Sequence, residues 1–209
     1  MCCQLGGILY EEGRVLYESD NFFVAPTIGL IGIEGYLLML SKNCFHGFGA
    51  IPEILHQEAE DVLTHTKRVL RDSYGVESQV FEHGPKVCNT RGGSCFDHAH
   101  LHIVPGVNIM DPLASEFMRR MTSINDAYRA ERIDGWRKVS EIVQQGKHSY
   151  FMAEEPGGKR VVIEVNYHLP SQFMRRIIGQ QRGTDEWDFA VFPQKELFER
   201  TLDRLRGRF

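Results

Sequence analysis

The sequence predicts an α+β fold in which a sheet of short antiparallel strands packs against one long helix. Two observations support this fold class. Short apolar runs, separated by glycine, asparagine and aspartate, recur through the first half of the chain, as expected for strands joined by turns. One long stretch with helical spacing interrupts them, so the elements come as strands, a helix and strands rather than in strict alternation.

The first half should contain short strands at residues 14–18, 22–25, 35–40, 78–81 and 99–104. The long helix is expected at residues 52–74. Pro52 suits its first turn, apolar residues recur at helical spacing along it, and Gly75 stands where helices commonly end.

The second half is predicted to add helices and strands. A charged helix should begin at Pro112. Further elements are a hairpin of residues 150–153 and 160–165 and helices at residues 170–181 and 194–206. This change of pattern predicts two units, residues 1–110 and a C-terminal α/β extension, residues 111–209, packed on the first.

The composition is typical of a soluble globular protein. The 209 residues carry a formal net charge of −4, so no overall positive field would attract nucleic acid. The longest uncharged run, residues 21–33, is broken by Pro26, Gly29 and Gly32 and is too short to cross a bilayer. The 5 cysteines are an odd number with no secretory leader before them, which favours reduced thiols and a cytoplasmic location.

Three histidines, His98, His100 and His102, stand at alternate positions in and just before one expected strand. Alternate side chains of a strand share a face, so the three rings should line up about 6.7 Å apart. Ala99 and Leu101, which lie between them, should face the core on the opposite side.

Three interpretations of this pattern are open. The first is a surface strand that happens to be rich in histidine. The second is a zinc site completed by His83 or an acid, although three same-face positions on a straight strand diverge too far to reach one ion. The third is nucleophilic imidazole chemistry on phosphorus, which becomes the favoured interpretation once the resemblance described next is included. The small residues upstream, Gly93, Ser94 and Cys95, favour it because glycine lets backbone N–H groups turn toward an anion.

Residues 97–105, DHAHLHIVP, resemble the histidine triad (HIT) motif, in which three histidines alternate with apolar residues and two apolar residues follow. Residues 81–84 (FEHG) and 35–42 (GYLLMLSK) are similar to strands of the same superfamily, and the resemblance covers about residues 10–106. Residues 169–176 (LPSQFMRR) resemble extensions of certain bacterial HIT-like proteins and of CwfJ-like domains. The resemblance implies a HIT-like fold.

The resemblance also implies a reaction. His100 would attack the α-phosphate of a dinucleoside polyphosphate or nucleoside phosphoramidate, forming a nucleotidyl-histidine that water or another acceptor then cleaves. The backbone carbonyl of His98 would hold the Nδ1–H of His100, and His102 would bond a non-bridging oxygen. Hydrolase and nucleotidyl transferase both fit this scheme. The expected substrate contacts are Gly93, Ser94, Cys95, Asn89, Glu82 and His83.

Two departures from the family keep a second function open. The family usually has Ser or Thr where this chain has Cys95, and many of its hydrolases have a further histidine near the position of Ile28. His46 and His83 are candidate substitutes for that histidine. The alternative is therefore a nucleotide- or RNA-binding module with little or no turnover.

The remaining expectations concern cofactors and partners. No cofactor is obligatory, although a divalent metal could accompany the substrate. The resemblance suggests a homodimer, and no membrane partner is expected. Arg175 and Arg176 could reach a polyphosphate or lie on a solvated helix face. No protein-bound metal is predicted, because Cys-x-x-Cys spacing is absent from the nearest zinc candidates, Cys2, Cys3, Cys44 and His46.

Overall fold

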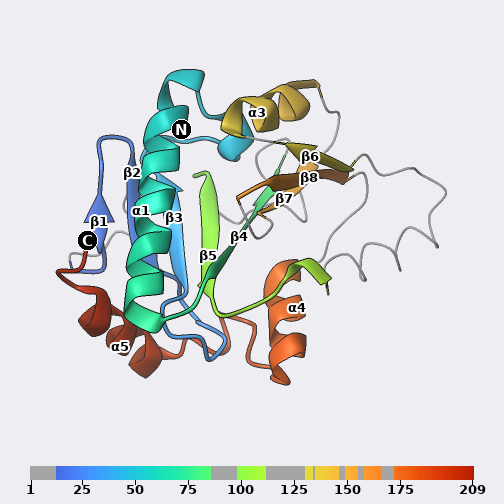
Figure 1. Cartoon of the computed structure of the whole chain (residues 1–209). Coiled ribbons are helices and arrows are strands. Elements are labelled where there is room, and N and C mark those ends of the chain that lie inside the picture. Colours follow the sequence, from blue (N-terminus) through green and yellow to red (C-terminus); the bar gives the residue numbers. More distant parts are fainter. Residues whose placement is uncertain are drawn as a thin grey trace.

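The computed structural model is a mixed α+β chain built around an antiparallel sheet, as the sequence predicts (Figure 1). It describes residues 13–85, 98–111, 130–133, 135–145, 149–154, 158–165 and 172–209, and residues 130–133 are described for their backbone alone. The helix expected from Pro112 onward lies outside these ranges.

One sheet contains the strands of the described residues, and every neighbouring pair is antiparallel. It is an 8-stranded sheet in the order β1-β2-β3-β5-β4-β7-β8-β6. Every strand expected from the sequence is present, with its ends shifted by a few residues, whereas β6 was not expected. The bounds are β1 Tyr17–Glu18, β2 Phe22–Pro26, β3 Leu37–Ser41, β4 Ser78–Gly84, β5 His100–Pro105, β6 Ala130–Ile133, β7 Ser149–Glu154 and β8 Arg160–Val165.

The helix expected at residues 52–74 is confirmed as α1, His56–Tyr74, preceded by the short 3-10 helix η2, Glu53–Leu55. Gly75 ends α1 in the left-handed conformation, with φ 68°, and its N–H bonds to the carbonyl oxygen of Arg71. The other described helices are η1 Phe48–Ala50, α3 Gly135–Gln145, α4 Phe173–Arg182 and α5 Lys195–Leu205. The last two confirm the expected C-terminal helices, whereas α3 was not expected.

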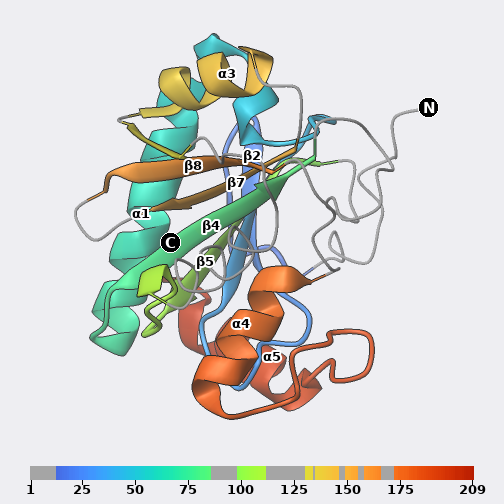
Figure 2. The same cartoon turned by 90° about the vertical axis from the view of Figure 1, so that its right-hand side faces the viewer.

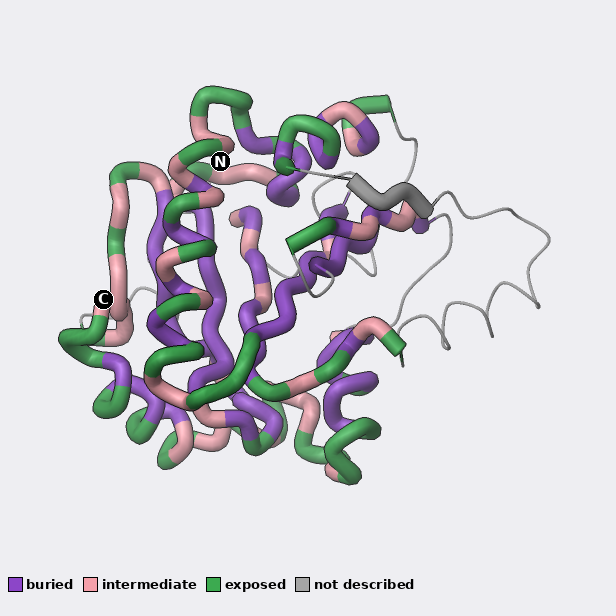
Figure 3. The backbone as a smooth tube through the Cα atoms, viewed as in Figure 1, coloured by how far each residue is buried: buried purple, intermediate pink, exposed green. Residues whose placement is uncertain are grey.

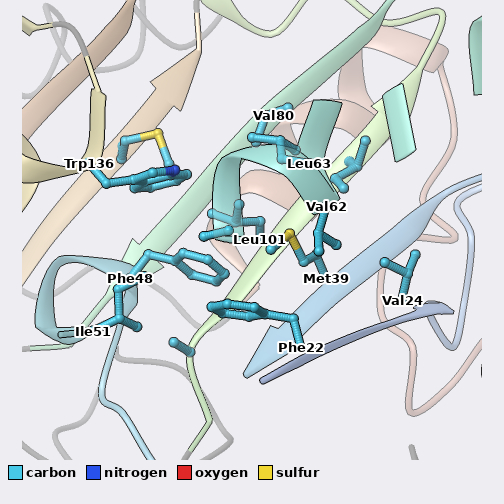
Figure 4. Packing of buried hydrophobic residues seen from close by; sticks show 14 of the residues in the cluster. Phe22, Val24, Met39, Phe48, Ile51, Val62, Leu63, Val80, Leu101 and Trp136 are labelled. Atoms are coloured by element: carbon cyan, nitrogen blue, oxygen red, sulfur yellow. The ribbon is translucent and has the colours of Figure 1, made fainter. Parts of the chain in front are cut away.

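The sheet separates two hydrophobic clusters, because successive side chains of a strand point to opposite faces. On one face, residues of α1, η1 and α3 pack against Met39, Val80 and Leu101 (Figure 4). On the other face, residues of α4 and α5 pack with Leu38 and Phe81. Figures 1 and 2 place α4 and α5 near one end of the strands and α3 near the other.

The second half of the chain continues the sheet of the first half. β7 pairs with β4, so that Phe81 lies opposite Ala153 and Gly84 lies opposite Tyr150. Only glycine fits at position 84, because a Cβ there would lie 2.0 Å from Cε1 of Tyr150. The paired central strands are buried along most of their length (Figure 3). Among the helices of the described ranges, none is both long and apolar enough to cross a membrane.

Candidate active site on the histidine strand

The histidine triad lies on and just before β5, the strand between β3 and β4. Leu101 points into the cluster beneath α1, so His100 and His102 point to the opposite face of the sheet. There His102 lies opposite Leu38 of β3 and Phe81 of β4. The expected alternation of histidines and core residues is therefore present in the structure.

His100 has a defined proton position. Its Nδ1 lies 3.1 Å from the carbonyl oxygen of His98. A carbonyl oxygen can only accept, so Nδ1 carries the proton and donates it, and Nε2 of the neutral ring carries a lone pair. Burial lowers the pKa of His100 below its usual 6.5, although the hydrogen bond to His98 acts in the opposite direction. His100 is therefore a neutral imidazole near pH 7 with Nε2 as its nucleophilic atom.

His102 is held by aromatic neighbours. The Phe81 ring stacks on it with ring centres 4.5 Å apart and an angle of 7° between the planes. The His100 ring meets it edge-on at 5.1 Å. The hydroxyl oxygen of Tyr36 lies 2.8 Å from its Nδ1. Burial, followed by the nearby charges of His100, Arg175 and His83, lowers the pKa of His102 well below 6.5.

The ring of His98 contacts the last residue of β3 and the segment that follows it. Its Nδ1 lies 3.0 Å from the carbonyl oxygen of Ser41, and its Nε2 lies 4.0 Å from Sγ of Cys44. Cys44 is disulfide-bonded, which differs from the reduced thiols expected from the sequence. The contact that His98 makes with His100 is thus through its backbone carbonyl.

The structure does not bring Glu82 to the triad. Its neighbours on β4, Phe81 and His83, face the histidines, so the Glu82 side chain points to the other side of the sheet. There one oxygen accepts the N–H of Phe48 at 2.6 Å, and the other accepts the hydroxyl of Tyr150. Glu82 is only 1% exposed, and burial raises its pKa to about 7. These contacts give Glu82 a structural role in holding the η1 turn against the sheet.

His83, in contrast, lies on the triad face, and its charge is one of the influences on the pKa of His102. His83 therefore shares a face of the sheet with His100 and His102, and its role in substrate binding stays a prediction. The other expected substrate contacts, Asn89, Gly93, Ser94 and Cys95, lie outside the described residues. Their roles stay predictions.

The interpretation that Arg175 lies on a solvated helix face is wrong, since the residue is only 5% exposed. That it reaches a polyphosphate stays a prediction. Its Nε donates to the carbonyl oxygen of Trp187 at 2.9 Å, and its Nη2 donates to the carbonyl oxygen of Gly29. Arg176 is exposed, with its guanidinium carbon 4.9 Å from the ring centre of Trp187.

Within the ranges that the structure describes, no group of three or more His, Cys, Asp and Glu side chains is arranged to hold a metal ion. Of the zinc candidates, His46 is exposed, and Cys2 and Cys3 lie outside those ranges. No protein-family model matches this chain, and no curated protein matches it. A function for this site is therefore inferred from the geometry of its residues and not from a relative.

Sequence reasoning missed Tyr36 and the true position of Arg175. Tyr36 precedes β3 by one residue, and alternation places it with Leu38 on the triad face. The alternation of residues 35–40 therefore already placed Tyr36 on one face of the expected strand. That face could be assigned to the histidines only once β3 was known to pair with β5.

Proposed function

We propose that this chain is a nucleotide hydrolase or nucleotidyl transferase that cleaves at the α-phosphate of a dinucleoside polyphosphate or nucleoside phosphoramidate. The observation that carries the proposal is the 3.1 Å contact between Nδ1 of His100 and the carbonyl oxygen of His98. It leaves a lone pair on Nε2 of a neutral ring, and a neutral imidazole is a competent nucleophile near pH 7.

The reaction has two steps. Nε2 of His100 forms a bond to the α-phosphorus, and the bond from phosphorus to the leaving oxygen or nitrogen breaks with its electron pair on the leaving group, which takes up a proton. The ring becomes positively charged in this adduct, and the His98 carbonyl oxygen stabilises that charge through the Nδ1–H. Water, or an acceptor phosphate or alcohol in a transferase, then attacks phosphorus and loses a proton. The N–P bond breaks, and neutral His100 returns.

His102 is the second group in this proposal. Its ring centre is 5.1 Å from that of His100 on the same face of the sheet, so a phosphate attacked by His100 would have a non-bridging oxygen within its reach. Donors directed at an oxyanion commonly contribute a large part of catalysis in acyl and phosphoryl transfer. Residues 86–97, which precede the triad in the sequence and lie outside the described ranges, are expected to supply further donors.

The decisive experiment compares wild type with His100→Ala on a panel of nucleotide conjugates, with products identified by mass spectrometry. We expect the variant to lose turnover by ~10³ or more and to retain binding, because only the nucleophile is removed. His56→Ala is the matched control, since His56 lies at the start of α1 and bonds to Ser140, away from the triad.

Two results would contradict the proposal. Turnover in His100→Ala equal to wild type would exclude the nucleotidyl-histidine. Binding by wild type without turnover of any conjugate would instead support a nucleotide- or RNA-binding module.

A further inference from the structure

Tyr36 connects the triad to the C-terminal helices. The residue is fully buried, and its hydroxyl oxygen lies 2.8 Å from Nδ1 of His102. On the other side, the guanidinium carbon of Arg175 lies 5.7 Å from the centre of the Tyr36 ring, and its positive charge interacts with the phenol. These contacts join β5, the residue before β3, and α4.

The hydrogen bond between Tyr36 and His102 has only one consistent direction. The positive charge of Arg175 beside the ring favours a hydroxyl whose proton points away from the guanidinium. The phenol keeps its own proton, because burial raises the pKa of Tyr36 to about 12. Among the described residues, Nδ1 of His102 is the acceptor that the structure shows for this proton. The Tyr36 hydroxyl therefore donates to Nδ1, and neutral His102 carries its proton on Nε2.

We propose that Tyr36 and Arg175 are positioning residues that hold His102 as its Nε2–H tautomer, so that it donates a hydrogen bond to a non-bridging oxygen of the substrate phosphate. The catalytic part of this inference rests on the proposed function. The tautomer itself is a property of the free protein.

The two neighbouring histidines thereby acquire opposite tautomers. The proton of His100 is on Nδ1, facing the His98 carbonyl, so its Nε2 carries a lone pair. The proton of His102 is on Nε2, and this nitrogen has no hydrogen-bond partner among the residues that the structure describes. One face of the sheet then presents a nucleophile and an N–H donor side by side. An attacked phosphate needs both, because charge develops on its oxygens as the new bond forms.

The charge of Arg175 has a second effect on the same ring. A nearby positive charge disfavours a second proton on His102 and lowers its pKa, in addition to the larger effect of burial. A protonated His102 would carry hydrogen on Nδ1 and would lose the hydrogen bond from Tyr36. The pair therefore keeps the ring neutral as well as selecting its tautomer.

Arg175 is itself fixed in place. It donates to the carbonyl oxygens of Trp187 and Gly29, which belong to two different segments. The contact at Gly29 requires glycine, since a Cβ there would lie 2.8 Å from Cα of Phe189. The N–H of Gly35, the residue before Tyr36, donates to Oγ1 of Thr201 on α5 at 3.1 Å. The segment before Tyr36 is therefore bonded to α5 through Thr201 and to α4 through Arg175.

Backbone strain gathers at this contact. The non-glycine residues with positive φ in the described part of the chain are Ile31, Gln172 and Gln194. Gln194 accepts the N–H of Gly32 at 3.1 Å, and Gln172 accepts the N–H of Phe189 at 3.2 Å. Such conformations persist only where the surroundings determine them strongly, and they are frequent at functional sites. The contact between residues 27–36 and the C-terminal segment is therefore built to hold one arrangement.

The first test reads the tautomers without any substrate. Long-range ¹H–¹⁵N spectra of the free protein distinguish the two neutral forms of each histidine, with His102 assigned from a His102→Gln variant. We expect the Nε2–H form for His102 and the Nδ1–H form for His100. In Tyr36→Phe, the His102 signals should move toward a mixture of both forms. The matched control is Tyr74→Phe, because Tyr74 also pairs with an arginine, Arg204 at 4.7 Å, away from the triad.

The second test measures turnover. Without the Tyr36 hydroxyl, His102 should populate both neutral tautomers, so its Nε2–H donor is present only part of the time. Tyr36→Phe should therefore lower kcat by about tenfold with little change in KM. Arg175→Lys should have a smaller effect in the same direction, and Arg204→Lys is its control. Melting temperatures of all variants separate loss of folding from loss of positioning.

The outcomes are distinct. An Nδ1–H form of His102 in wild type, or an unchanged His102 spectrum in Tyr36→Phe, would overturn the inference. Unchanged kcat in a folded Tyr36→Phe with altered tautomers would overturn its catalytic part. The predicted tautomers in a protein without turnover would contradict the proposed function and leave the tautomer assignment standing.

Discussion

The carbonyl oxygen of His98 lies 3.1 Å from Nδ1 of His100, so the backbone of one triad residue fixes the proton of the next. The side chain of His98 takes no part in this contact. Its ring is bonded instead to the Ser41 carbonyl oxygen at 3.0 Å. Backbone and side chain of one residue thus have separate roles, and mutation can separate them.

His98→Ala should therefore be a mild variant. The carbonyl oxygen is retained, so we expect turnover to fall by less than about tenfold, against ~10³ or more for His100→Ala. Steady-state kinetics on the same substrate gives both values. Equal losses in the two variants would mean that the His98 ring takes part in the reaction.

The pH dependence of kcat/KM should report His100. Burial lowers its pKa, so the lone pair on Nε2 is lost only when the pH falls through a value below 6.5. Activity should rise with pH along an acidic limb centred below that value and then level off. His83→Gln should keep the same midpoint. A limb centred above 6.5, or one that disappears in His83→Gln, would assign the titration to another group.

Glu82 should make the protein less stable as the pH rises. Its folded pKa is about 7, above the usual 4.5, so the folded state binds more protons than the unfolded state between these values. The free energy of unfolding should fall across this window by on the order of 1–3 kcal/mol relative to Glu82→Gln, and remain level above it. Urea unfolding of both proteins over this pH range measures the difference.

A second variant checks the cause of that pH dependence. The hydroxyl of Tyr150 donates to Glu82 and lowers its pKa, so Tyr150→Phe should extend the decline to higher pH. A wild-type stability that rises with pH relative to Glu82→Gln would show that Glu82 is ionised in the folded protein.

Gly84→Ala should weaken the junction between β4 and β7. The added Cβ would lie 2.0 Å from the ring of Tyr150, and overpacking of this kind costs about 1–3 kcal/mol or more. In a double-mutant cycle, the same substitution should cost less when Tyr150 is already alanine. Equal costs in both backgrounds would mean that the Tyr150 ring does not limit the space at position 84.

The strands and the long helix could be predicted because their own residues carry the signal. Gly75 ends α1 as expected, and the alternation around Leu101 places the histidines on one face. β6 was missed because its four residues, which among the described strands pair with β8 alone, form a weak local pattern. α3 has buried residues at helical spacing, such as Trp136 and Val139, but lies in a charged stretch that hides it.

The site was predictable only along the strand that carries it. His98, His100 and His102 are neighbours in sequence, so their geometry follows from the period of a strand. Tyr36 and Arg175 reach His102 through pairing and packing between distant segments, and no local pattern specifies those contacts. Glu82 was wrongly expected to contact the substrate because it is a polar residue near the motif. Its carboxylate is instead bonded to Phe48 on the other face of the sheet.

The most direct measurement of the central claim is isolation of the covalent intermediate. Wild type is mixed with a substrate identified in the panel, quenched rapidly without acid, digested and analysed by mass spectrometry. We expect a nucleotidyl group on the peptide that contains His100, stable in base and lost at low pH because the phosphorus is bonded to nitrogen. Its absence from His100→Ala is the control. Turnover by wild type with no adduct, or with the adduct on a peptide that lacks His100, would contradict the account.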